Sequence, residues 1–143
     1  MPFLEEQNKK IVKEAIKKAE AITSGEIRVC VEKHCKEDVL DRAAYYFKQL
    51  EMHKTSQRNG VLIYLATEDR KFAIIGDVGI NMKIDFGFWH ETKEVMLAHF
   101  KQGLLIEGLV KGIEKAGNAL GQFFPPISDN KNELSDDIYF GNE

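Results

Sequence analysis

The stretch NGVLIYLATEDRKFAIIGDVGINMKID, residues 59–85, decides the fold of this chain. It contains two apolar runs, 60–67 and 72–77, which are joined by the charged turn 68–71. Nearly continuous apolar runs of this length are typical of strands that are buried on both faces. Because the connection between them is short, the two strands are expected to pair antiparallel. The stretch therefore predicts a buried β-hairpin in a sheet that is covered on both sides.

The segments on either side of this hairpin predict a layered fold. Residues 26–33 alternate between apolar and polar side chains as a first strand does, and because the second face is polar at both ends, we expect only its centre to be deeply buried. A helix between the first and second strands is long enough for a right-handed parallel crossover. We expect an α/β fold, a three-layer α/β/α sandwich with a small mixed sheet and the element order αβαββαα. Helical periodicity is found in residues 3–22, 38–50 (with Asp38 as the N-cap), 88–102 and 105–123.

Length and charge predict one domain with an acidic end. The 143 residues are 43% hydrophobic, which is enough for one core. Residues 125–143 carry five acidic side chains and one lysine, whereas the remaining 19 basic and 18 acidic residues nearly cancel. We expect a single domain over residues 1–125 and an acidic, mobile tail over residues 126–143. Because the body has no basic field, we expect no nucleic-acid partner.

The N-terminus and the cysteines bear on the compartment. The chain is charged from Glu5 onward, without an apolar signal region, and no apolar run has the length of a membrane span. We therefore expect a cytoplasmic protein without a transmembrane segment, in which Cys30 and Cys35 are buried free thiols. The basic face of the first helix, residues 9–18, is typical of a solvated helix surface, and an anionic membrane is the alternative ligand for it.

The predicted topology brings polar residues together at one rim of the sheet. The first and second strands begin at this rim and the third strand ends there, so Glu26, Asn59 and Asp77 should be near neighbours. The loop that carries Asn81 and Asp85 leaves from the same rim. We favour this rim as the binding site because its oxygen ligands are dense, and because glycines in the loop let the backbone approach a ligand.

The opposite rim is the competing location. It gathers residues 34–38 and the turn 68–71 at the carboxyl ends of the parallel strands, where open α/β sheets usually bind ligands. His34 and Cys35 are adjacent and have no second pair of ligands, which makes a poor zinc site. Asp69 beside Arg70 is typical of a tight turn, with anion binding as the alternative.

Four residues at the favoured rim are candidate metal ligands. Ca²⁺ takes about 6–8 oxygen ligands, and three carboxylates, an amide and backbone carbonyls supply most of that number. Taken alone, the residues favour the alternative of solvated strand-end acids, with Glu26 paired to Arg58 or Lys83. The candidate ligands are Glu26, Asp77, Asn81 and Asp85.

Catalytic motifs give no assignment. The sequence contains no P-loop, GxGxxG, GxSxG or HExxH motif, and no nucleophile with an adjacent base can be named. His90, in the first turn of the third helix, is a candidate proton donor. The residues alone do not decide whether the chain is an enzyme, and they assign no catalytic residue.

Several short motifs together resemble the TPM domain family. They are SGEIRV (24–29), NGVLIYLATEDRKFAIIGDVGI (59–80), FW (88–89) and HFKQGLLIEGLVKGIEKAGNAL (99–120). The family comprises domains of thylakoid-lumen photosystem II repair proteins and of many bacterial proteins, and the resemblance covers residues 5–125. It implies an α/β/α sandwich, binding of divalent cations (calcium in particular) and a weak acid-phosphatase activity known in plant members. Bacterial relatives commonly carry a signal peptide and a membrane anchor, so this chain resembles a stand-alone cytosolic version.

The resemblance changes the balance at the candidate rim in favour of metal binding. We expect a domain that binds Ca²⁺, or Mg²⁺, and that acts through a protein partner rather than by catalysis. The alternative is a weak metal-dependent acid phosphatase that uses the same acidic residues.

Overall fold

The predicted hairpin forms one side of the sheet, with its first strand inside the sheet and its second strand at the edge. In the computed structural model, which describes residues 5–126 and 138–141, β2 (Gly60–Ala66) pairs antiparallel with β3 (Lys71–Gly76). The first strand, β1 (Glu26–Glu32), lies parallel to β2, with Glu26 opposite Gly60. The strand order is β3-β2-β1-β4. The mixed sheet is therefore confirmed, with parallel and antiparallel pairs in the predicted places.

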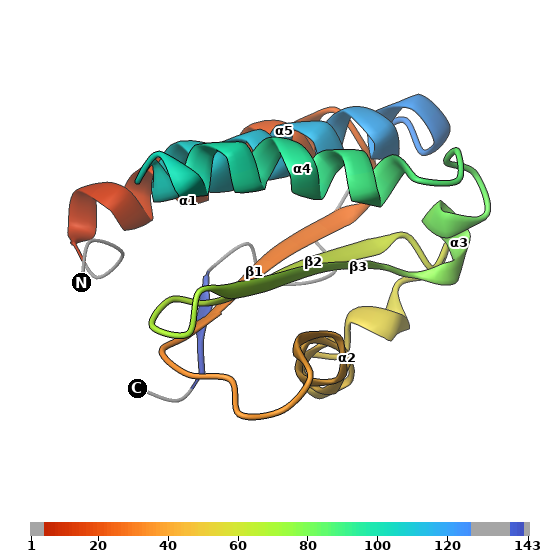
Figure 1. The fold of residues 1–143 in the computed structure, drawn as a ribbon. Helices are drawn as coiled ribbons and strands as arrows, with labels where there is room; N and C mark the ends of the chain where they lie inside the picture. Colours follow the sequence, from red (N-terminus) through yellow and green to blue (C-terminus); the bar gives the residue numbers. More distant parts are fainter. Residues whose placement is uncertain (1–4, 127–137, 142–143) are drawn as a thin grey trace.

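Helices cover both faces of this sheet (Figure 1). The crossover helix α2 (Val39–Gln49) and the short 3₁₀ helix η2 (Met52–Lys54) lie on one face. The other face is covered by α1 (Glu6–Ala21), α4 (Phe88–Lys101) and α5 (Leu105–Phe123). The three-layer α/β/α sandwich is confirmed.

Each face of the sheet packs against its own core. Ile63 and Leu65 of β2 belong to the core under α1, α4 and α5, whereas Leu62 and Tyr64 belong to the core under α2. Successive side chains of a strand point to opposite faces, so a strand covered on both sides needs apolar residues at every position. This explains why all seven residues of β2 are buried.

The crossover helix begins where the sequence predicts. The Asp38 side chain accepts the backbone N–H groups of Leu40 at 2.9 Å and Asp41 at 3.3 Å, which satisfies two donors that the first helical turn leaves unpaired. No helix in the described part of the chain is both long and apolar enough to cross a bilayer.

Three short elements depart from the predicted order, and the first is the 3₁₀ helix η2. A single turn, α3 (Val78–Asn81), follows β3 directly, where we expected a loop. The strand β4 (Tyr139–Phe140) pairs parallel with β1, and the Gly141 N–H donates to the Val31 carbonyl at 2.7 Å. We expected residues 126–143 to be a mobile tail, but Ile138–Gly141 dock on the sheet because Ile138 adds an apolar side chain to the core. The rest of that predicted tail, residues 127–137 and 142–143, lies outside the described residues.

Candidate functional site

The sheet register places three of the predicted residues at one rim. Glu26 lies opposite Gly60, and the Asp77 N–H donates to the Gly60 carbonyl at 2.9 Å, so these residues form one row across three strands. The Asn59 carbonyl accepts the N–H of Glu26 at 3.3 Å. The prediction that Glu26, Asn59 and Asp77 are near neighbours is confirmed.

Asp77 is already paired with a cationic side chain. Its Oδ2 accepts Nε of Arg58 at 2.7 Å and its Oδ1 accepts Nη2 at 2.8 Å, while Oδ1 also accepts the Val78 N–H at 2.7 Å. The hydrogen bond to Asp77 raises the pKa of Arg58. The Asp77 side chain is 4% exposed and the Arg58 side chain 48%, so a surface arginine closes over a buried carboxylate. The alternative pairing that we considered from sequence gave Arg58 to Glu26, whereas the structure gives it to Asp77.

The other two predicted ligands differ in their availability. Asn81 connects α3 to its neighbours, because its Nδ2 donates to the Gly76 carbonyl at 2.7 Å and its Oδ1 accepts Nε1–H of Trp89 at 2.7 Å. The Asp85 side chain is exposed on the loop before α4, and its backbone carbonyl accepts the Phe88 N–H at 3.0 Å. Asn81 is therefore held as a structural link, whereas Asp85 is open to solvent.

The carboxylates of this rim are not gathered into one group. Within residues 5–126 and 138–141, no three or more His, Cys, Asp or Glu side chains are placed so that they could hold a metal ion. Glu26 and Asp77 stand two strands apart, which separates their Cα atoms by about 10 Å. Met52 of η2 fills the space over Gly60 between them, since a Cβ on Gly60 would lie 2.9 Å from the Met52 carbonyl oxygen. No local sequence pattern predicts this position of Met52.

A buried oxygen at the same rim lacks a donor. Asn59 is 1% exposed, and its Oδ1 has no hydrogen-bond partner in the described part of the chain. Buried acceptors without a partner are uncommon in folded proteins, because each loses its hydration without compensation. The Asn59 N–H, by contrast, is bound by Oγ1 of Thr55 at 3.0 Å. An amide oxygen of this kind is a suitable ligand for a hard cation.

The segment that follows Asp77 carries exposed apolar side chains. Val78 is 53% exposed, Met82 83% and Phe86 108%. Single exposed apolar residues are common, but here α3 and the loop after it expose three apolar side chains within nine residues. We call residues 78–86 the apolar loop.

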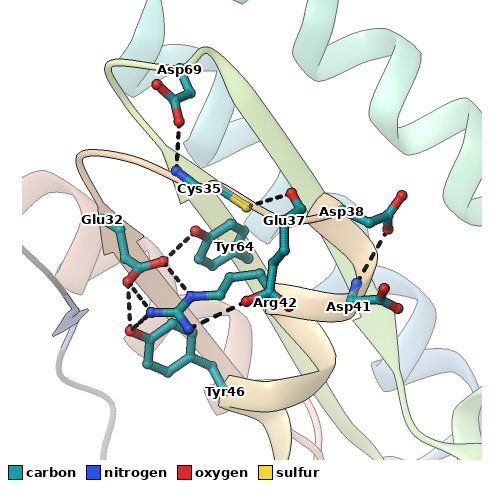
Figure 2. Close-up of polar contacts among 9 residues, drawn as sticks. All are labelled: Glu32, Cys35, Glu37, Asp38, Asp41, Arg42, Tyr46, Tyr64 and Asp69. Carbon is teal, nitrogen blue, oxygen red and sulfur yellow. Dashed lines mark hydrogen bonds and ion pairs between the residues drawn. The ribbon is translucent and has the colours of Figure 1, made fainter.

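The opposite rim contains an ion pair that the sequence analysis missed (Figure 2). Glu32 ends β1 with a fully buried side chain, and its two oxygens accept Nη2 of Arg42 at 2.8 Å and Nε at 3.0 Å. The Tyr46 hydroxyl donates to Glu32 at 2.6 Å, and the Tyr64 hydroxyl donates to the other oxygen. Our expectation of shallow burial at the ends of β1 is wrong, because Arg42 and two tyrosines compensate the charge of Glu32. Arg42 lies three residues after Val39 and four before Tyr46, on the inward face of α2. This helical spacing is the feature of the sequence that indicates an inward-facing Arg42.

The hydrogen bonds of this pair set the protonation of its members. The bond to Glu32 raises the pKa of Arg42, and burial, followed by the bond to Glu32, raises the pKa values of Tyr46 and Tyr64. All three are protonated at neutral pH at their ordinary pKa values, and the raised values extend this state to higher pH. Because the Glu32 oxygens are saturated, this arrangement can fix α2 on the sheet but offers no free base.

The hairpin tip is tied to the β1–α2 loop at the same rim. Asp69 accepts the Cys35 N–H at 2.6 Å and contacts Nδ1 of His34 at 3.0 Å. The bond to His34, followed by the bond to Cys35, lowers the pKa of Asp69. The described hydrogen bonds of the Asp69 side chain therefore go to the β1–α2 loop, and not to its own turn as predicted. Cys30 and Cys35 are buried and free, as predicted, and burial raises the pKa of Cys30.

The sequence matches the family model described as TPM domain over residues 2–119. The chain belongs to the TPM domain family. Its fold is also that of the BA42 protein from the psychrophilic bacterium Bizionia argentinensis, known from an NMR structure. The two chains are 47% identical, with a TM-score of 0.90 over 97% of this chain and 96% of that one. The resemblance inferred from the sequence motifs is confirmed.

Two more distant solved structures share the fold of this TPM domain. The N-terminal domain of the cg2496 protein from Corynebacterium glutamicum is 13% identical, with a TM-score of 0.66 over 84% of this chain and 76% of that one. The N-terminal domain of a protein from P. gingivalis is 17% identical, with a TM-score of 0.68 over 85% and 79%. At these identities the likeness concerns the fold alone. No functionally curated protein matches the sequence.

Proposed function

We propose that this TPM domain binds a divalent cation, Ca²⁺ or Mg²⁺, at the rim formed by the start of β1, the start of β2 and the end of β3. The observation that carries the proposal is the buried Asn59 Oδ1, which has no donor in the described part of the chain, at the same rim as Glu26 and Asp77. Carboxylate and amide oxygens are the ligands that both cations prefer. Asp77 is the central ligand, and exposed Asp85 on the adjoining loop adds a further carboxylate.

We expect the site to bind a cation weakly, because its residues must rearrange before the cation can enter. Arg58 already neutralises Asp77, so a cation competes with the guanidinium for the same two oxygens. The half-exposed Arg58 side chain can turn into solvent when it is displaced. Glu26 and Asp77 lie two strands apart, with Met52 over Gly60 on the strand between them, so Glu26 joins only if the rim rearranges. We expect a dissociation constant on the order of 10⁻⁴–10⁻³ M, the range of low-affinity calcium modules.

The apolar loop supports action through a protein partner. Met82 and Phe86 lie on the segment that leaves Asp77, so a cation on Asp77 would change the anchoring of a surface suited to protein contact. The alternative, a weak metal-dependent acid phosphatase, would use the same carboxylates and would lose its activity in Asp77→Ala.

Thermal unfolding tests the cation site. A Ca²⁺ concentration of about ten times the dissociation constant stabilises the folded state by about 1.4 kcal/mol. For a domain of this size that raises Tm by about 3–6 °C relative to NaCl of equal ionic strength. We expect this increase in the natural chain and in Asp41→Asn, which removes an exposed carboxylate from the opposite rim, but not in Asp77→Asn. An equal increase in Asp77→Asn would exclude the proposed site.

A further inference from the structure

A depression of about 470 Å³ opens between the tip of the β2–β3 hairpin and the α4–α5 turn. Small-molecule sites typically have volumes of about 300–1,000 Å³. The depression lies near the carboxyl end of β2, the edge where open α/β sheets usually bind ligands. It shares no lining residue with the proposed cation site. Its apolar lining consists of Leu65, Phe72, Leu97, Phe100 and Leu105.

The walls of this depression are apolar and fixed in place. Phe72 of β3 and Phe100 of α4 meet edge to face, with 4.9 Å between ring centroids. Both rings are half-buried, so each leaves part of its surface facing the depression. Covering such surface removes apolar area from water, which favours association. The walls therefore favour a ligand with an apolar body.

The mouth of the depression is positively charged. Arg70 and Lys101 line it, and none of the described residues that line it is acidic. Both side chains are exposed, and neither has a hydrogen bond or ion pair within the residues that the structure describes. Lys93 adds a third positive charge, with its Nζ 5.6 Å from the centre of the Phe72 ring. Asp69, next to Arg70 in the chain, is held by His34 and Cys35 instead.

We propose that this depression binds an amphipathic monocarboxylate, such as a free medium-chain fatty acid. The carboxylate would lie between Arg70 and Lys101, and the apolar chain would cover Phe72 and Phe100. A guanidinium pairs with a carboxylate through parallel hydrogen bonds, which favours an acid over a neutral molecule of the same shape. A small inorganic anion would leave the apolar walls uncovered.

The backbone of Arg70 makes the charge testable without disturbing the hairpin. Arg70 has a φ of 55°, in the left-handed region that asparagine adopts more readily than arginine. Arg70→Asn therefore removes the guanidinium while keeping a residue suited to the turn. Lys101→Gln removes the second charge at the end of α4, and Lys48→Gln, on the opposite face of the sheet, is the matched control.

The experiment is a titration of ¹⁵N-labelled protein with sodium octanoate, compared with butyrate and octan-1-ol at equal concentrations. We expect saturable amide shifts at the lining residues with octanoate, and weaker binding of both comparison ligands. Arg70→Asn and Lys101→Gln should each weaken octanoate binding by about fivefold, the upper range for an exposed ion pair. Lys48→Gln should leave it unchanged.

A second variant blocks the space rather than the charge. Leu105→Trp fills the apolar end, and we expect it to abolish the octanoate shifts while the rest of the amide spectrum is retained. The proposal is overturned if octan-1-ol binds as tightly as octanoate, if both charge variants bind octanoate with natural affinity, or if the shifts follow the lysine face of α1. Association only with anionic phospholipid vesicles would also overturn it.

Discussion

Arg58 and Asp77 are joined by two hydrogen bonds of 2.7 and 2.8 Å, which connect a guanidinium that is 48% exposed to a carboxylate that is 4% exposed. The pair lies at the rim where β1 and β2 begin and β3 ends. The arginine therefore occupies the position that the proposed cation needs, and this competition is the first consequence that can be measured.

Removing the guanidinium should tighten cation binding. In Arg58→Asn, no guanidinium competes with the cation for the Asp77 carboxylate. Asparagine also suits the left-handed backbone at this position, where φ is 53°. We expect the calcium dissociation constant to fall by about two- to fivefold, since solvent screens the half-exposed guanidinium and makes it a modest competitor. Arg70→Asn is the matched control, because it removes another left-handed arginine far from the rim. Unchanged or weaker binding in Arg58→Asn would contradict the competition.

The buried pair at the opposite rim should behave as one unit. Arg42→Met leaves the Glu32 carboxylate buried without its cationic partner, and we expect a loss of about 3 kcal/mol in the free energy of unfolding. Glu32→Gln combined with Arg42→Met removes both charges and should cost clearly less than the sum of the single changes. Urea unfolding of the four proteins measures this coupling. Additive losses would show that the two side chains do not depend on each other.

Asp69 should support stability against acid. Its pKa is lowered in the folded state, first by His34 and then by the Cys35 N–H. A carboxylate of this kind contributes stability above the ordinary aspartate pKa of 3.8, and the contribution is lost as pH falls through the lower folded value. We expect the urea midpoint of Asp69→Asn to lie below that of the natural chain at neutral pH, and the difference to shrink below about pH 4. Glu68→Gln, which removes one negative charge from the same turn, is the matched control.

The apolar loop should be dispensable for folding. Met82 and Phe86 are 83% and 108% exposed, so Met82→Ser and Phe86→Ser should change the free energy of unfolding by no more than about 0.5 kcal/mol. Calcium binding should also be retained, because neither side chain supplies an oxygen ligand. Thermal unfolding with and without calcium checks both points. A loss typical of core residues would mean that the loop serves the fold and not a partner.

The elements of the fold could be predicted where local signals agreed with burial. The apolar runs of the hairpin, the Asp38 N-cap and the helix over residues 105–123 each carry a local pattern, and each is present. Tyr139 and Phe140 have only two positions in which to show a strand pattern, within an acidic segment. Their pairing depends on the free edge of β1, which no local pattern contains.

The sequence predicts where the candidate site lies, but not which side chains contact one another there. Strand order fixed the neighbours Glu26, Asn59 and Asp77, because topology determines which strand ends meet. The choice of Arg58 as partner for Asp77, and the position of Met52 over Gly60, depend on the path of residues 52–58, where the sequence indicates only a polar linker. The Glu32–Arg42 pair was missed because an acid at the end of a strand is usually solvated.

The most direct test is a titration of the ¹⁵N-labelled domain with CaCl₂ and MgCl₂, followed by its amide spectrum, on the natural chain and on Asp77→Asn. The account predicts saturable shifts at Glu26, Asn59 and residues 77–85 in the natural chain, and their loss in Asp77→Asn with the remaining spectrum intact. Shifts confined to the acidic residues after Pro126, or equal shifts in both proteins, would contradict a cation site at this rim.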